Sequence, residues 1–187
     1  MESEEQRWIR EYLEGQVDSL GKLVERTKRP LYAYICKMVG DRFDADEIFQ
    51  EVWIRASRSL AQYRDKSLMG WLCRIAHNLM IDRFRSQQSA VSLDAPYADD
   101  GPALSDQLAD PAPDPAEAAG AMDLRARILE AVARLPPEQR EVFLLRSEAS
   151  LPFKEIARIQ GVSINTALAR MQYAIRKLRY DLKDLDV

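Results

Sequence analysis

Amide, hydroxyl and cationic side chains recur at helical spacing near the C-terminal end of this 187-residue chain. If residues 164–178 form a helix, these side chains share one face, and an apolar arc occupies the opposite face. Groups of this kind bind base edges and phosphates in duplex nucleic acid. We therefore predict a DNA-binding face that comprises Asn165, Thr166, Ala169, Arg170, Tyr173, Arg176 and Lys177.

The segment before this face has the spacing of a helix-turn-helix motif. Ala157 is small where two helices would approach each other, and Gly161, four residues later, permits the left-handed backbone of a tight turn. Ser163 can cap the second helix, whose N-terminal end enters the major groove in motifs of this kind. Base contacts are expected from Asn165, Thr166 and Arg170, and phosphate contacts from Arg176 and Lys177.

The apolar arc of the second helix is expected to pack inward. Its members recur at intervals of three and four residues, which is the pattern of a buried helix face. With Leu168 partly buried in this way, the helix offers fewer groups to DNA. The arc comprises Ile164, Ala167, Leu168, Met171, Ile175 and Leu178.

A second set of hydrogen-bonding and cationic residues lies on a helix that is expected to start near Ser67. The set avoids the apolar stripe of that helix. Aromatic rings stack on unpaired bases, an amide reads a base edge, and cations follow phosphates, so these residues suit single-stranded DNA. The alternative is that the aromatic member is a core residue. The set comprises Trp71, Arg74, Asn78 and Arg85.

A helix predicted around residues 44–60 has a polar side rich in acids. Residues 44–47 resemble a capping box, which would start this helix. Acids this dense repel DNA, so a protein surface is the more natural partner, and a face that is merely solvated is the alternative. The polar side includes Asp46, Glu47, Gln50 and Glu51.

The chain divides into two mildly basic halves and an acidic segment between them. Residues 87–120 contain seven acids, five prolines and no Lys or Arg, which indicates an extended linker. Residues 1–86 and 121–187 carry net charges of +1 and +3, and both show helical periodicity. One helix should end at Gly40, with a break at Pro30. We predict an all-α fold of two small helical domains, 1–86 and 121–187, joined by the acidic linker 87–120.

The composition argues against an enzyme, a metalloprotein and a membrane protein. Two cysteines and one histidine cannot supply the roughly four ligands of a zinc site. The sequence contains no Gly-rich phosphate loop and no nucleophile motif. No apolar run approaches the ~20 residues of a membrane span, and the acidic N-terminus is unlike a secretory signal. We expect a cytoplasmic protein without a cofactor, a metal ion or a membrane insertion.

Three segments, in order, resemble conserved regions of extracytoplasmic-function (ECF) sigma factors of the sigma-70 superfamily. Residues 44–56 (DADEIFQEVWIRA) resemble the second region of that family, and residues 70–85 (GWLCRIAHNLMIDRFR) resemble its −10 recognition segment. Residues 135–143 (LPPEQREVF) and 155–179 are similar to the fourth region. The resemblance covers nearly all of the chain outside the linker.

The resemblance implies a function and partners. The acidic helix would dock on the β′ clamp helices of the RNA polymerase core, and the helix with Asn78 would bind the −10 element of promoter DNA. The residue 166–177 face would read the −35 element, the linker would run towards the polymerase active-site channel, and an anti-sigma factor would inhibit the protein. Leu168 and Ala169 depart from the Lys and Ser common in the family. The alternative function is that of a free-standing helix-turn-helix regulator.

Overall fold

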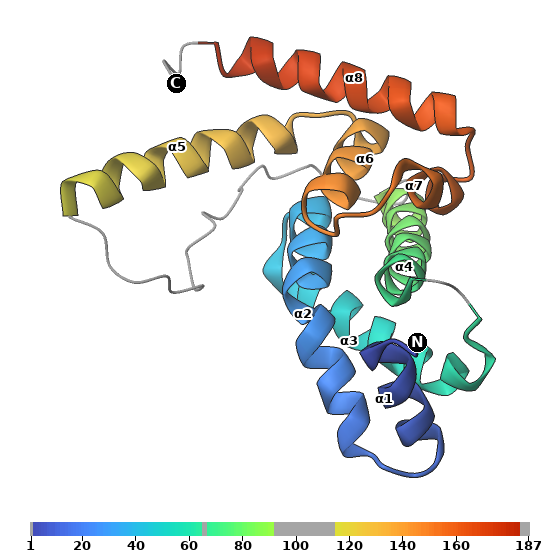
Figure 1. Ribbon diagram of the computed structural model, residues 1–187. Helices are drawn as coiled ribbons and strands as arrows, with labels where there is room; N and C mark the ends of the chain where they lie inside the picture. Colours follow the sequence, from blue (N-terminus) through green and yellow to red (C-terminus); the bar gives the residue numbers. More distant parts are fainter. Residues whose placement is uncertain (1, 65–66, 92–114, 184–187) are drawn as a thin grey trace.

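The computed structural model describes residues 2–64, 67–91 and 115–183. These residues form eight α-helices and one short 3-10 helix, and none of them lies in a strand (Figure 1), which confirms the predicted all-α fold. The helices are α1 (Glu4–Leu13), α2 (Asp18–Val39), α3 (Arg42–Ser59), η1 (Leu60–Gln62), α4 (Leu68–Val91), α5 (Pro115–Ala133), α6 (Pro137–Ser147), α7 (Phe153–Gln160) and α8 (Ile164–Asp181).

Helix α2 is continuous through Pro30 (Figure 1), so the predicted break is wrong. Proline lacks the N–H that would bond to the carbonyl one turn earlier. Packing outweighs that loss, because Leu23, Leu31 and Tyr34 on both sides of the proline are fully buried. The helix ends as predicted at Gly40, whose φ of 80° lies in the left-handed region.

Helix starts in the first half differ from the predictions at two places. Asp41, and not the segment 44–47, caps α3: its carboxylate accepts a hydrogen bond from the Asp44 N–H at 2.9 Å. Helix α1 was not predicted, although Ser3 and Gln6 form a capping box with reciprocal bonds of 3.2 and 3.0 Å. In both cases an acid or hydroxyl satisfies the free N–H groups of the first helical turn.

The second half follows the predicted pattern. Pro137 occupies the first turn of α6, where its missing N–H costs no helical hydrogen bond. Gly161 ends α7 with a φ of 64°, and Ser163 caps α8 by accepting a hydrogen bond from the Thr166 N–H at 3.1 Å. The helix-turn-helix expected from the spacing is therefore formed by α7 and α8.

The two halves of the chain pack directly against each other. Helix α2 contacts α6, and α4 contacts α7 (Figure 1), while buried side chains from both halves form one apolar cluster. Helix α4 reaches Val91 and α5 begins at Pro115, so both helices enter the predicted linker 87–120. The remainder of that linker, residues 92–114, lies outside the described residues.

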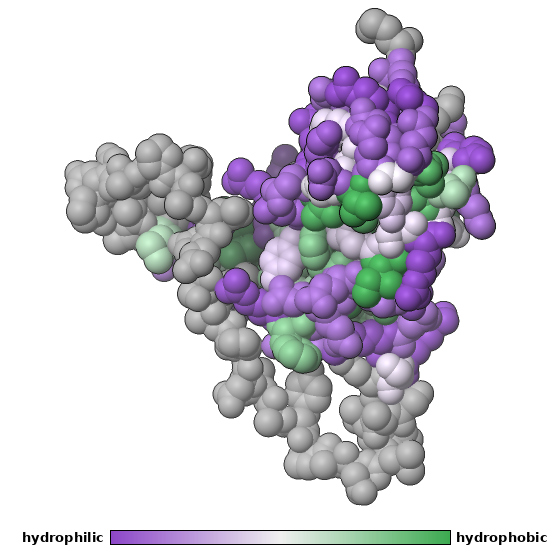
Figure 2. Space-filling model, turned by 90° about the horizontal axis from the view of Figure 1, so that it is seen from below, coloured by the Kyte–Doolittle hydropathy of each residue, from purple (hydrophilic) through white to green (hydrophobic). Residues whose placement is uncertain are grey.

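One face of the molecule is mostly hydrophilic (Figure 2). On the face shown in Figure 2, apolar residues form only small, separate spots among hydrophilic ones. Within the described ranges, no helix has both the length and the apolar composition needed to cross a membrane. Large apolar side chains that are exposed include Phe43 on α3 and Ile164 and Leu168 on α8.

Candidate nucleic-acid interface

The residues predicted to bind DNA on α8 lie along one stretch of that helix and are at least partly accessible. The exposed members are Asn165, Thr166, Tyr173, Arg176 and Lys177, and the half-buried members are Ala169 and Arg170. Their exposure follows from the position of α8, which packs on α6 and α7 and buries Ala167, Ala174 and Leu178. The structure thus brings the predicted set together on a single helix that begins at a solvent-exposed turn.

The predicted apolar arc of α8 is correct only in part. Ala167, Ala174 and Leu178 are buried, whereas Ile164 and Leu168 are 45% and 38% exposed. At 3.6 residues per turn the buried arc is centred near Ala167, and Leu168 lies about 100° from that centre. The prediction that Ile164 and Leu168 pack inward is therefore wrong.

The three cations of the predicted set on α8 differ in their surroundings. Arg170 donates a hydrogen bond from Nη1 to Gln160 Oε1 of α7 at 2.9 Å, which ties α8 to α7. The Arg176 guanidinium lies over the Tyr173 ring at 4.8 Å from its centroid. Lys177 pairs with Asp181 at 3.1 Å. Arg176 and Lys177 are themselves exposed, so both remain accessible to phosphate.

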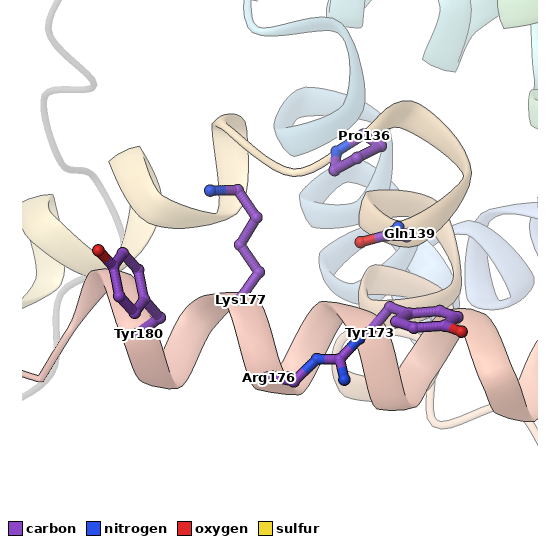
Figure 3. A pocket seen from close by; sticks show the side chains of 6 residues that line it. All are labelled: Pro136, Gln139, Tyr173, Arg176, Lys177 and Tyr180. Carbon is purple, nitrogen blue, oxygen red and sulfur yellow. The ribbon is translucent and has the colours of Figure 1, made fainter.

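An open groove of about 500 Å³ runs between the start of α6 and the second half of α8. Figure 3 shows its lining side chains, four of which are spread along α8 below the first turn of α6. It is lined by Pro136, Gln139, Tyr173, Arg176, Lys177 and Tyr180. The two cations and the positive end of α6 give this groove a potential that favours an anionic strand.

The predicted set on α4 is also partly accessible. Trp71 is half-buried, and its ring contacts that of Tyr63 at a centroid distance of 5.0 Å in a tilted arrangement, so it is neither a fully buried core residue nor a free ring. Asn78 and Arg85 are exposed, and Arg74 is half-buried. The start of α4 faces α7, where an added Cβ on Gly70 would lie 3.7 Å from Glu155 Oε2. The side chains on the later turns of α4 are therefore more exposed to solvent than those on its first turn, which faces α7.

The acids predicted on α3 have partners within the chain. Asp46 accepts a hydrogen bond from the Tyr32 hydroxyl at 2.7 Å, and burial together with this carboxylate raises the pKa of Tyr32 to about 12. Glu51 pairs with Arg55 at 2.7 Å. Gln50 is exposed. The face is therefore less strongly negative than its composition predicts.

Arg83 of α4 holds the acidic helix in place. It pairs with Glu47 at 2.8 Å and also with Asp44, so its positive charge is balanced by two acids of α3. A groove of about 420 Å³ between α3 and α4 has Ile48 and Leu79 among its apolar lining and Glu47 and Glu51 among its acids. Apolar side chains flanked by charge suit contact with another protein.

Glu141 of α6 joins the two halves through a buried polar cluster. Its Oε1 accepts a hydrogen bond from the Tyr34 hydroxyl of α2 at 2.7 Å and lies 2.6 Å from His77 Nδ1 of α4. Its Oε2 accepts one from Gln160 Nε2 of α7 at 2.9 Å. The residue is only 6% exposed. We refer to Tyr34, His77, Glu141 and Gln160 as the Glu141 cluster.

The partners in the Glu141 cluster keep its acid ionised. Burial by itself would raise the pKa of the Glu141 carboxyl, but hydrogen bonds from His77, Gln160 and Tyr34 outweigh burial, so this pKa lies below its ordinary value. Burial and the nearby carboxylate raise the pKa of Tyr34 well above its ordinary value, so its phenol remains a hydrogen-bond donor. The cluster is therefore a charged acceptor with donors from both halves.

Two further polar contacts join α2 to the second half. Lys37 Nζ lies 2.7 Å from Glu148 Oε1, and both side chains are about a quarter exposed. Arg140 donates from Nη1 to the Met38 carbonyl at 3.3 Å. These contacts surround the apolar interface between α2 and α6, so the two halves are held by buried and peripheral polar groups together.

Acid is expected to weaken the contact between the halves. A carboxyl whose pKa is lower in the folded chain adds stability above its unfolded pKa of about 4.3, and this stability is lost as pH falls through the folded value. The distance between probes on α2 and α6 should be followed from pH 7 to pH 3. It should therefore increase as the pH falls below about 4.3. Glu141→Gln should reduce this acid dependence, and an equal acid dependence in both proteins would contradict the assignment.

Two family models match the chain, one on each half. Sigma-70 region 2 matches residues 23–90, from within α2 to the end of α4, and Sigma-70, region 4 matches residues 125–178, from within α5 to α8. The ECF RNA polymerase sigma factor SigW of Bacillus subtilis (strain 168) is 29% identical over 179 residues, which cover 95% of this chain and 96% of SigW. SigK of Mycobacterium sp. (strain KMS) is 27% identical over 173 residues, covering 91% and 86%.

Solved structures share the fold. The sigma factor RpoE of Bartonella quintana, in complex with the anti-sigma factor NepR, aligns with a TM-score of 0.67 at 20% identity over 89% of this chain and 98% of its own. CnrH, in complex with the cytosolic domain of CnrY, aligns with a TM-score of 0.66 at 21% identity over 98% and 99%. Both alignments extend across both halves of the chain.

Proposed function

Because this chain belongs to the ECF sigma factors of the sigma-70 family, whose role is promoter-specific initiation of transcription, we propose that its two halves bind the −10 and −35 elements separately. The observation that carries the proposal is the presence of one accessible, polar and cationic helix face in each half, on α4 and on α8. The acidic groove between α3 and α4 supplies a third surface, which suits protein and not DNA.

In the second half, α8 would lie in the major groove of the −35 element. Its capped N-terminal turn presents Asn165 and Thr166, whose amide and hydroxyl groups suit base edges. Arg176 and Lys177 line the groove below α6 and would contact the phosphates alongside. The division between the two ends of the helix matches the usual docking of a helix-turn-helix on duplex DNA.

In the first half, α4 would hold unpaired bases of the −10 element. The ring pair of Trp71 and Tyr63 offers an aromatic surface at the side of this helix. Asn78, about two helical turns further along α4, is exposed and supplies an amide, and Arg85 supplies a charge. Stacking, edge reading and phosphate contact by neighbouring groups are the means by which single strands are bound.

The groove between α3 and α4 would receive the β′ clamp helices of the RNA polymerase core. Its floor is apolar and its margin is acidic, and Arg83 fixes the position of Glu47 at that margin. Such a groove suits an amphipathic helix with basic residues. The proposal also includes an anti-sigma factor as the inhibitory partner and a cytoplasmic location. The acidic linker, of which residues 92–114 lie outside the described residues, would run towards the active-site channel of the polymerase.

Reconstitution with the core enzyme tests the proposal. The purified chain is mixed with core RNA polymerase, and complex formation and transcription from a promoter library are measured. Selective transcription from a subset of promoters is expected. Tight binding of the chain alone to duplex DNA, with no complex with the core, would instead support a free-standing helix-turn-helix regulator.

Glu51→Lys is expected to weaken binding to core polymerase by about tenfold, because it reverses a charge at the edge of the α3–α4 groove. Affinity for the core can be measured by fluorescence anisotropy of the labelled chain. The matched control is Glu25→Lys on α2, since Glu25 is also exposed and paired with a neighbouring cation, Lys28. Equal affinities for the two variants would show that the α3 face is merely solvated.

A further inference from the structure

Two large apolar side chains are exposed at the N-terminal end of α8. Ile164 and Leu168 are 45% and 38% exposed, and they are one helical turn apart. Both lie outside the buried cluster that contains Ala167 and Leu178 of the same helix. Apolar side chains at this position are shielded from water only when a binding partner covers them.

Leu168 lies at the edge of the predicted DNA-binding face of α8, beside Asn165. Asn165, three residues earlier, and Gln172, four residues later, are exposed, and residues at these spacings are neighbours on a helix surface. Leu168 therefore has hydrogen-bonding side chains on both sides along the helix. A group that approaches Asn165 and Gln172 together must also approach Leu168.

The charge of the helix indicates the class of partner. The exposed side of α8 carries Arg176, Lys177 and Arg179, and its N-terminal turn adds the positive end of the helix dipole. A polyanion is the complementary partner for such a surface. In duplex DNA, the C5-methyl group of thymine is the apolar group that the major groove presents beside hydrogen-bonding base edges.

We propose that Leu168, supported by Ile164, contacts a thymine methyl group and so sets a preference for thymine at one position of the −35 element. This inference rests on the proposed docking of α8 in the major groove. It also reverses the expectation from the sequence, in which a partly buried Leu168 would have reduced the contacts of this helix with DNA. The exposed leucine instead adds an apolar contact beside the polar ones.

Removal of single methyl groups from promoter DNA tests the proposal. The preferred −35 element is first selected from a randomised library with the complete chain bound to core polymerase. Each thymine in that element is then replaced by deoxyuridine, which removes only the methyl group. We expect one replacement to weaken promoter binding by about fourfold, the effect of removing one buried methyl-sized group.

Variants of Leu168 connect the methyl effect to this side chain. Leu168→Ala and Leu168→Gln should weaken binding to the thymine promoter and should make it insensitive to the critical deoxyuridine. Both changes are at an exposed position, so the fold should tolerate them. Lys177→Ala is the control, because loss of a phosphate contact should weaken thymine and deoxyuridine promoters equally.

Each other outcome overturns the proposal. Full deoxyuridine sensitivity in Leu168→Ala, or no sensitivity at any thymine in the unmodified chain, would exclude the methyl contact and leave the docking of α8 intact. Weaker assembly of Leu168→Ala with core polymerase in the absence of DNA would show that Leu168 binds a protein. A library selection without any −35 preference would overturn both this inference and the proposed role of α8.

Discussion

Replacing Glu141 by alanine is expected to lower the free energy of unfolding by about 3 kcal/mol and to separate the two halves of the chain. The buried carboxylate accepts hydrogen bonds from Tyr34 of α2 and Gln160 of α7 and pairs with His77 of α4. Its removal leaves the Tyr34 hydroxyl and His77 Nδ1 without this acceptor, whereas Gln160 Nε2 keeps its bond to the Glu138 carbonyl at 3.0 Å. A buried polar group that loses its partner is not compensated for its desolvation.

Thermal unfolding and small-angle scattering measure the two consequences of this change. The melting temperature should fall, and the radius of gyration of the variant should increase as the halves move apart. Glu148→Ala is the matched control, because it removes a partly exposed partner of Lys37 from the same interface and should cost about 1 kcal/mol or less. A Glu141→Ala variant that remains as compact and as stable as the Glu148→Ala variant would contradict the assignment.

The Glu141 cluster holds the two halves closer together than the proposed binding to both promoter elements allows. Elements centred 25 base pairs apart are separated by about 85 Å along a duplex, at 3.4 Å per base pair. In the structure α4 and α7 are in contact, so the two halves cannot occupy both elements while they are packed together. Binding at both elements therefore requires the Glu141 cluster to dissociate, and any ligand of the open form must offset the energy of that interface.

The features predicted correctly from the sequence are those with local causes. The turn at Gly161 and the cap at Ser163 depend on residues within one helical turn, and their types alone indicate the backbone conformation. The acidic cap of α3 was misplaced because several acids compete for that role at the start of the helix. Asp41 takes it because Gly40 ends α2 in the left-handed conformation immediately before.

Apart from helix α1, whose local capping box was overlooked, the features that were missed depend on tertiary contacts. Glu141 lies 107 residues from Tyr34 and 64 residues from His77, so no pattern in its own segment marks it as the centre of a cluster. Pro30 stays within α2 because of side chains that are buried by other helices. Leu168 lies at the margin of an apolar arc, where spacing alone does not decide whether a side chain is buried, and it is exposed.

Arg170→Ala is expected to reduce −35-dependent transcription by about tenfold, provided that this side chain reads a base as proposed. In the structure Arg170 bonds to Gln160 Oε1, and the amide of Gln160 donates to Glu141. Arg170, Gln160 and Glu141 all lie in the second half, so these two bonds can persist when the halves separate. Arg170 would exchange its bond with Gln160 for a base edge when α8 binds the promoter. Transcription from promoters with and without a −35 element measures the effect, while affinity for the core should be unchanged.

Gln160→Ala separates base reading from a positioning role. If Arg170 acts only by holding Gln160, the two variants should lose the same amount of −35-dependent transcription. If Arg170 contacts a base, its variant should also lose discrimination at one position of the −35 element, while Gln160→Ala keeps that discrimination. Unchanged transcription in Arg170→Ala would remove this residue from the reading set and leave Asn165 and Thr166, at the exposed N-terminal turn of α8, as the polar readers.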